Sequence, residues 1–149
     1  SRKKEANKMK FYKGNTPPLS IEDLISLENK IDYTFPEDYR NFLIIHNGGQ
    51  PERQILNVPD CENDIIINIF FGIGKPHADI QFWLNELEDD LKGAFIPIGF
   101  DPGANALLME RSDGNFYYWD SARHFPCSSD EENTFWVADS FYDLLEKLR

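Results

Sequence analysis

Cysteine is scarce in this sequence, and Cys61 and Cys127 are the only two. They lie far apart, whereas a structural zinc site needs several ligands at short spacings, so we expect no bound metal. The two thiols could pair, but nothing in the sequence points to export, and we expect a reduced, cytoplasmic protein. No run approaches the ~18 apolar residues of a membrane-spanning helix, and an apolar signal core is missing. We therefore expect no membrane association.

Positive charge is scarce outside the N-terminus. The formal net charge is −11, but residues 1–13 carry a net charge of +5, which leaves −16 for the other 136 residues. An acidic body of this kind repels phosphate backbones and argues against a nucleic-acid partner. The charge favours a basic protein partner, or it serves solubility alone.

The first 18 residues are basic and polar, and Pro17 and Pro18 end the stretch. We expect residues 1–18 to form a flexible basic tail, and both a solvated tail and an anion-binding arm fit this composition. Residues 19–149 are enough to bury one hydrophobic core, so we expect a single domain there.

Complete motifs for catalysis or cofactor binding are also missing. The glycines of residues 72–74 lack the third glycine of a dinucleotide-binding fingerprint. Asp101 and Asn105 begin like a calcium loop, but Ala106 and Ser112 stand where glycine and glutamate are required. We interpret Asp101 and Asn105 as turn residues that hydrogen-bond to their own backbone. We expect no catalytic residue, no cofactor and no enzymatic activity.

Three apolar runs at residues 95–99, 106–110 and 115–120 form the predicted centre of the fold. Turn residues separate them at 101–105 and 112–114, and the second turn contains Asp-Gly, a strong hairpin signal. The runs therefore predict an antiparallel meander. Further strands are expected at residues 55–58, 65–71 and 134–138.

Capping signals predict helices that begin near Ser20, Pro36 and Ser140. Residues 79–91 have helical spacing and predict one more helix between strands. The expected fold class is thus α+β, with two N-terminal helices, a mostly antiparallel sheet, one inserted helix and a C-terminal helix. The predicted buried faces of the first two helices consist of Ile21, Leu24, Ile25 and Ile31, and of Tyr39, Phe42, Leu43 and His46. We expect His46 to be a packed or capping residue.

Three segments resemble the SUKH superfamily, the Smi–Knr type domains. They are FPEDYRNFLIIHNGG at residues 35–49, FIPIGFDPGANALLME at residues 95–110 and VADSFYDLLEKL at residues 137–148. In this family a Pro-acid-x-Tyr/Phe helix ends in Asn-Gly-Gly, a strand-turn-strand contains Asp-x-x-Gly-Asn, and a helix closes the domain. One position departs from the pattern, because Ala104 precedes Asn105 where the family has glycine.

The resemblance implies a protein-binding domain. Many bacterial members look like immunity proteins that neutralise a toxin, and others resemble regulators of cell-wall synthesis. An acidic surface would complement the basic cleft of a nuclease toxin. The candidate partner-binding residues are Glu86, Glu88, Asp89, Asp90, Asp130, Glu131 and Glu132, with Asp60, Glu62 and Asp64 as a third patch. A regulatory scaffold and an undetected enzyme or small-ligand binder beside the meander remain alternatives.

Overall fold

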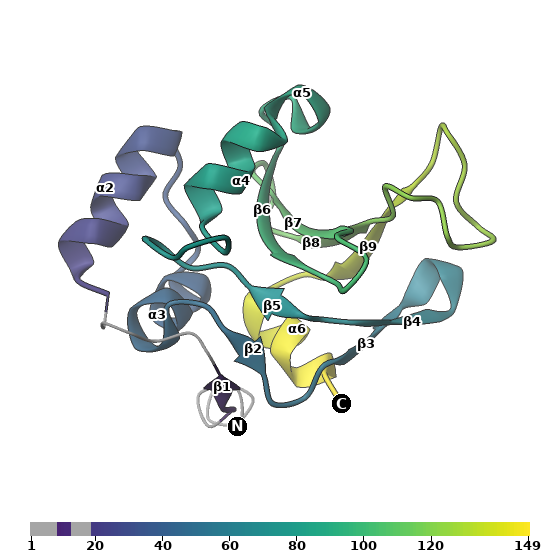
Figure 1. The fold of residues 1–149 in the computed structure, drawn as a ribbon, viewed down its shortest axis with the longest axis horizontal. Coiled ribbons are helices and arrows are strands. Elements are labelled where there is room, and N and C mark those ends of the chain that lie inside the picture. Colours follow the sequence, from purple (N-terminus) through teal and green to yellow (C-terminus); the bar gives the residue numbers. More distant parts are fainter. Residues whose placement is uncertain (1–8, 13–18) are drawn as a thin grey trace.

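A five-stranded antiparallel sheet forms the centre of the molecule (Figure 1). A computed structural model describes residues 9–12 and 19–149 of the chain. Sequential strands are neighbours throughout the sheet, so the predicted meander is confirmed. In order, the strands are β5 (Ile69–Phe70), β6 (Phe95–Phe100), β7 (Ala106–Glu110), β8 (Phe116–Trp119) and β9 (Thr134–Ala138).

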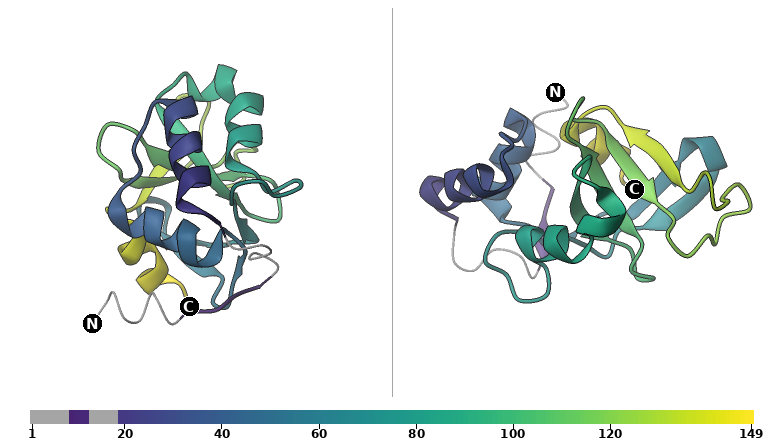
Figure 2. Two further views of the ribbon diagram at one scale, coloured as in Figure 1. Left: turned by 90° about the vertical axis from the view of Figure 1, so that its left-hand side faces the viewer. Right: turned by 90° about the horizontal axis from the view of Figure 1, so that it is seen from above.

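Helices cover both faces of this sheet, and the fold is α+β as predicted (Figures 1 and 2). They are α2 (Ile21–Ile31), α3 (Glu37–His46), α4 (Ile80–Glu86), α5 (Glu88–Leu91) and α6 (Phe141–Lys147). The main core lies on the face covered by α3 and α6, and a smaller apolar cluster lies under α4 and α5. The predicted single helix at residues 79–91 is divided at Leu87, where the backbone takes φ −102° and ψ 9°.

Two small hairpins complete the fold. In the first, β1 (Phe11–Tyr12) pairs with β2 (Gln50–Pro51). In the second, β3 (Ile55–Val58) pairs with β4 (Asn63–Ile66), and a 3₁₀ turn, η1 (Pro59–Cys61), joins these two strands. The predicted strand at residues 65–71 is therefore split between β4 and β5. The chain changes partner there, because the amide of Ile67 donates to Gln54 O and the next amide, of Asn68, donates to Phe100 O.

Part of the predicted flexible tail is ordered structure. Met9 is buried, and β1 pairs with β2. The ring of Phe11 packs on those of Phe42 and His46, with ring centroids 5.0 and 4.5 Å apart. The prediction of a flexible tail is therefore wrong for residues 9–12, and the rest of it, residues 1–8 and 13–18, lies outside the described residues. This pairing joins segments about forty positions apart in the chain, so a local sequence pattern cannot predict it.

The first helix buries a different stripe from the predicted one. Ser20 caps it as expected, because its Oγ accepts from the amide of Asp23 at 3.2 Å. Ile21 and Ile25 are 42% and 44% exposed. The buried stripe consists of Leu24, Leu27, Glu28 and Ile31. These residues follow the i, i+3, i+4, i+7 spacing that places side chains on one helical face.

Glu28 is buried because it joins α2 to α3. Its carboxylate accepts from the amide of Phe35 at 2.7 Å and from two guanidinium nitrogens of Arg40 at 3.0 Å. A paired and hydrogen-bonded carboxylate tolerates burial that an isolated one would not. On α3, Tyr39, Phe42 and Leu43 are buried as predicted. Across the described part of the chain, no helix is both long and apolar enough to cross a bilayer.

Candidate partner-binding surface

The acidic helix cluster, Glu86, Glu88, Asp89 and Asp90, lies at the divided end of α4 and α5. All four carboxylates are exposed. Leu84, Leu87 and Leu91 of the same segment pack on the sheet and fix the orientation of these short helices. The segment thus presents its charges to solvent on a supported backbone.

The acidic loop cluster, Asp130, Glu131 and Glu132, is also exposed and lies in the long loop between β8 and β9. A tight turn holds it, because the amide of Ser129 donates to Glu132 O at 2.9 Å and Ser129 Oγ accepts from the amide of Glu132 at 3.0 Å. Arg123 pairs with Asp130, with Nε and Oδ1 2.8 Å apart. One of the three loop charges is therefore already engaged within the chain.

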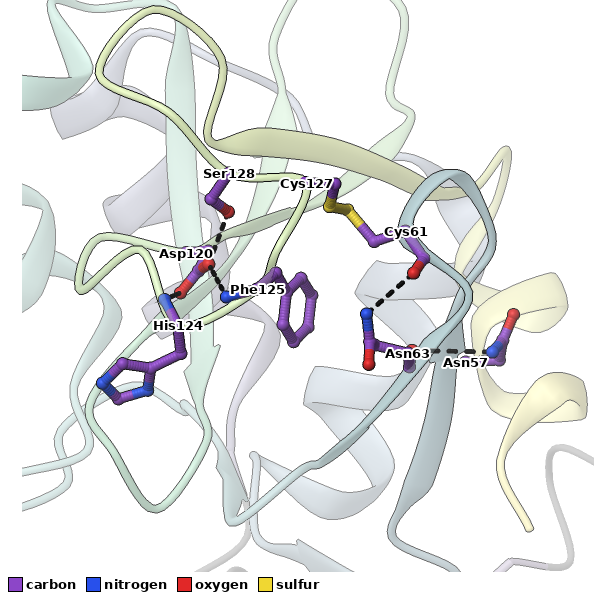
Figure 3. The surroundings of a disulfide bond; sticks show 8 residues. All are labelled: Asn57, Cys61, Asn63, Asp120, His124, Phe125, Cys127 and Ser128. Atoms are coloured by element: carbon purple, nitrogen blue, oxygen red, sulfur yellow. Dashed lines mark hydrogen bonds between the residues drawn. A yellow bond between two sulfur atoms is a disulfide. The ribbon is translucent and has the colours of Figure 1, made fainter.

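Asp120 anchors the start of this loop. It is fully buried and accepts hydrogen bonds from the amides of His124 and Phe125 and from Ser128 Oγ, at 3.0, 2.9 and 2.5 Å (Figure 3). Burial alone would raise the pKa of the Asp120 carboxyl, but these three donors outweigh it and hold the pKa below its ordinary value. A charged Asp120 thus fixes the path of residues 120–128.

The predicted bonding of the turn's own backbone is confirmed for Asp101 and wrong for Asn105, whose side chain instead supports the β8–β9 loop. Asp101 Oδ1 accepts from the amides of Gly103 and Asn105, both at 2.9 Å. Asn105 is buried, and its Oδ1 accepts from Ser121 Oγ at 2.9 Å and from the amide of Ala122 at 3.2 Å. The β6–β7 turn therefore holds the first residues of the β8–β9 loop.

A disulfide between Cys61 and Cys127 joins this loop to the β3–β4 hairpin (Figure 3). The prediction of two reduced thiols is therefore wrong for this structure. The two Cα atoms are 5.8 Å apart, although 66 positions separate the residues in the chain. Packing of the β3–β4 hairpin against β9 brings the cysteines together, since β9 and η1 are in contact, and this proximity cannot be read from their spacing in sequence.

The disulfide also brings two acidic clusters together. The acidic hairpin cluster, Asp60, Glu62 and Asp64, flanks Cys61 and is exposed. Hydrogen bonds from Asn57 and Arg149 lower the pKa of the Asp64 carboxyl, with the Arg149 nitrogen 2.7 Å from Asp64 Oδ2. Through Cys61–Cys127, this cluster lies beside the loop that carries the acidic loop cluster.

A hollow of about 240 Å³ separates α5 from the β8–β9 loop. The sheet forms its floor with Phe95, Leu108 and Trp119, and the other lining residues are Asp90, Leu91, Arg123, Asn133 and Thr134. Asp90 belongs to the acidic helix cluster, and Arg123 pairs with the acidic loop cluster. The hollow therefore places these two clusters on opposite sides of one concave surface.

The open part of this sheet face is aromatic. Phe95 and Tyr117 lie edge to face with centroids 5.7 Å apart, and Tyr117 is the cross-strand neighbour of Trp136. The sequence predicted a strand at residues 115–120 but not the hollow. The sequence signal for this second face is that successive strand residues point to opposite faces of a sheet. Phe116 and Tyr118 are buried in the main core, and Tyr117 and Trp119 are half-buried on the other face.

The histidines and carboxylates are arranged differently from a metal centre. In the described residues, no group of three or more His, Cys, Asp or Glu side chains could hold a metal ion. His46 packs between Phe11 and Phe42, and burial lowers the pKa of its imidazole. That the protein is not an enzyme stays a prediction.

Comparison with known proteins identifies the family. The sequence model of the SMI1 / KNR4 family (SUKH-1) matches residues 18–147, nearly the whole chain. The chain belongs to the SMI1 / KNR4 family. The resemblance inferred from the three sequence segments is therefore confirmed, and this SUKH-1 family includes toxin-immunity proteins.

A curated relative of this SUKH-1 chain comes from Bacillus subtilis (strain 168). It is described as the SPbeta prophage-derived uncharacterized protein YokK. The two sequences are 23% identical over 154 residues, which cover 91% of this chain and 78% of YokK.

Proposed function

We propose that this protein is a non-enzymatic binding domain that neutralises a protein toxin through its acidic surface. Membership in a family that includes immunity proteins supports the proposal. The observation that carries it is the arrangement of three exposed acidic clusters along one continuous path. This path runs from α5 across the hollow to the β8–β9 loop, and through the disulfide to the β3–β4 hairpin.

An acidic surface suits a partner that itself binds phosphate. Nuclease toxins hold their substrate in basic clefts, and a carboxylate-rich protein competes for the same charges. Long-range attraction also speeds encounter between the two proteins. A nuclease is therefore the kind of toxin that best fits this charge distribution.

The surface is preorganised by its internal contacts. Asp120, Asn105 and the disulfide each fix the β8–β9 loop from a different element. A loop that is already ordered loses little conformational entropy on binding, so more of the interaction energy appears as affinity.

The proposal is tested by co-expression with candidate toxins encoded next to its gene. Rescue of growth by this protein, together with a complex of the two purified proteins, is the expected result. Formation of a complex without rescue would favour the regulatory scaffold. A complex with a non-toxic cellular protein, in the absence of any toxin complex, would contradict immunity.

Reversal of the acidic helix cluster should weaken toxin binding. We expect Glu86→Lys, Glu88→Lys, Asp89→Lys and Asp90→Lys together to lower affinity by tenfold or more, since exposed charge pairs contribute ~0.2–1 kcal/mol each. Isothermal titration calorimetry at two salt concentrations measures this effect, and added salt should weaken the unmodified complex as well.

A suitable control is Glu22→Lys on α2, which lies at the opposite end of the molecule from the β8–β9 loop (Figures 1 and 2). This exposed residue should be replaceable with little loss of affinity. Equal affinity of the fourfold variant and the unmodified protein would remove α4–α5 from the interface. Reversal of the acidic loop cluster and the acidic hairpin cluster would then identify the remaining contact.

Cytoplasmic location remains part of the proposal. A nuclease toxin acts on intracellular nucleic acid, and its inhibitor must reach it there. Persistent disulfides are uncommon in the cytosol. Alkylation of free thiols in intact cells, followed by mass determination, reports the state of Cys61 and Cys127 where the protein acts.

A further inference from the structure

We propose that the hollow between α5 and the β8–β9 loop receives the guanidinium group of one arginine from a basic partner protein. This inference rests on the proposed function and assigns a contact to it. The hollow is where the sheet's aromatic face meets charged residues from two separate elements. It therefore combines aromatic surface and a carboxylate in one concavity.

The size of the hollow suits a single long side chain. Its volume is about 240 Å³. Pockets for drug-sized ligands and cofactors usually measure ~300–1,000 Å³. An extended side chain entering from a partner surface fits this volume better than a separate cofactor.

The lining selects a planar cation. Trp119 and Phe95 provide aromatic surface at the floor, and Asp90 provides a carboxylate at one wall. Guanidinium stacks on aromatic rings and bonds to carboxylates through a planar fork, whereas a lysine ammonium is compact and more strongly hydrated. Arginine is therefore favoured over lysine.

The chain's own Arg123 is the second charged side chain at the hollow. Its side chain lines the hollow, pairs with Asp130 at 2.8 Å and donates to Ser121 O at 3.2 Å. Asp90 and Arg123 are the charged lining residues, and they lie on different walls. In the complex, the partner's arginine pairs with Asp90. Arg123 stays paired with Asp130, and its positive charge repels the partner's arginine and lowers the affinity.

The test uses the free protein and small probes. Protein labelled with ¹⁵N is titrated with Nα-acetyl-arginine amide, and the indole N–H signals of its three tryptophans are followed. The indole nitrogen of Trp83, on α4, donates to His77 O, so Trp83 serves as the internal control. We expect a saturable shift of the Trp119 signal, a weaker one with Nα-acetyl-lysine amide, and none with the neutral citrulline analogue. Equal shifts with all three probes, or none with the arginine probe, would overturn the proposal.

Two variants locate the cation. Asp90→Asn should weaken arginine binding about threefold to fivefold, the effect of one partly exposed charge pair, whereas Glu22→Gln on α2 should leave it unchanged. Arg123→Asn should strengthen binding, because it removes the competing cation, and asparagine tolerates the φ of 55° found at this position. Arg149→Gln, at another exposed ion pair, is the matched control. Weaker binding by Arg123→Asn would contradict the assigned arrangement.

The arginine site and the proposed function can fail independently of each other. The probe titration needs no toxin, so failure to bind arginine leaves the rescue experiment unaffected. Arginine binding without any rescue of growth would refute the immunity function and support the arginine site. Loss of both probe binding and toxin affinity in Asp90→Asn would show that the toxin uses the arginine site.

Discussion

Ala104 adopts a backbone conformation that normally belongs to glycine. Its φ is 62°, within the Asp101–Asn105 turn, and its side chain is exposed. For a residue with a Cβ atom, a backbone in the left-handed region costs ~1–2 kcal/mol of conformational free energy. This is the position at which the chain departs from the glycine of the SUKH pattern, so the turn keeps its geometry with a less suitable residue.

Ala104→Gly should therefore stabilise the protein. We expect the free energy of unfolding to rise by about 0.5–1 kcal/mol, because relief of strain exceeds the added entropy of a glycine in the unfolded chain. Guanidinium denaturation measures the change. Ala122→Gly, at an exposed residue without positive φ, should instead destabilise by a similar amount. Loss of stability in Ala104→Gly would show that the turn bears no such strain.

At the scale of elements, β1 is held against the fold by its pairing with β2 and by aromatic contacts to α3. Phe11 lies 4.5 Å from the ring of His46 and 5.0 Å from that of Phe42. Burial lowers the pKa of His46, and its Nε2 is buried with no hydrogen-bond partner among the described residues. The attachment of β1 therefore depends on a neutral imidazole.

Acidification should weaken this attachment. The unfolded chain has a histidine pKa of ~6.5 and binds a proton more readily than the folded His46 does, so stability is full above pH 6.5 and falls as the pH drops toward the folded pKa. Unfolding free energies at pH 7.5 and pH 5 measure the loss. Asp120, whose pKa is also lowered, contributes to acid sensitivity only at still lower pH.

His46→Phe should reduce the loss of unfolding free energy between pH 7.5 and pH 5. Phenylalanine preserves the ring between Phe11 and Phe42 but cannot take up a proton. His77→Asn, at an exposed loop residue whose positive φ asparagine tolerates, should leave the loss unchanged. An identical pH dependence in His46→Phe and the unmodified protein would exclude His46 as its source.

At the scale of the whole molecule, the disulfide joins segments that the sheet topology has already brought together. A cross-link over 66 positions restricts the unfolded chain strongly. Loop-closure entropy assigns about 4 kcal/mol to a loop of this length. Much of the protein's resistance to unfolding therefore depends on its redox state.

Reduction with dithiothreitol should lower the free energy of unfolding by about 4 kcal/mol. The double variant Cys61→Ser and Cys127→Ser should resemble the reduced protein and show no response to dithiothreitol. Comparison of guanidinium unfolding curves measures both effects. Two titratable thiols in the purified, unreduced protein would contradict the bond itself.

Sequence signals located most elements because those signals are local. Residues 106–110 and 134–138 became β7 and β9 with the predicted bounds, and Ser20 and Ser140 cap their helices. Apolar alternation and capping need only a few neighbouring residues, so they can be read without tertiary structure.

The remaining features depend on contacts between distant segments. The pairing of β1 with β2, the Cys61–Cys127 bond and the hollow each require segments that the sheet brings together. The division of residues 65–71 likewise reflects a change of strand partner. For the candidate site, the exposed acidic residues could be identified from sequence, whereas their arrangement around the hollow could not.

Alternate residues of strand β8 contribute to two different faces of the sheet. Phe116 and Tyr118 face the main core, while Tyr117 and Trp119 face the side of the hollow. Under the proposed function, odd-numbered positions in this strand can therefore vary with the partner while even-numbered positions preserve the fold. Inserting or deleting a single residue in β8 would exchange the two sets, which would disrupt the core and the proposed contact together. Diversification of specificity at this strand should thus proceed by replacement of alternate residues.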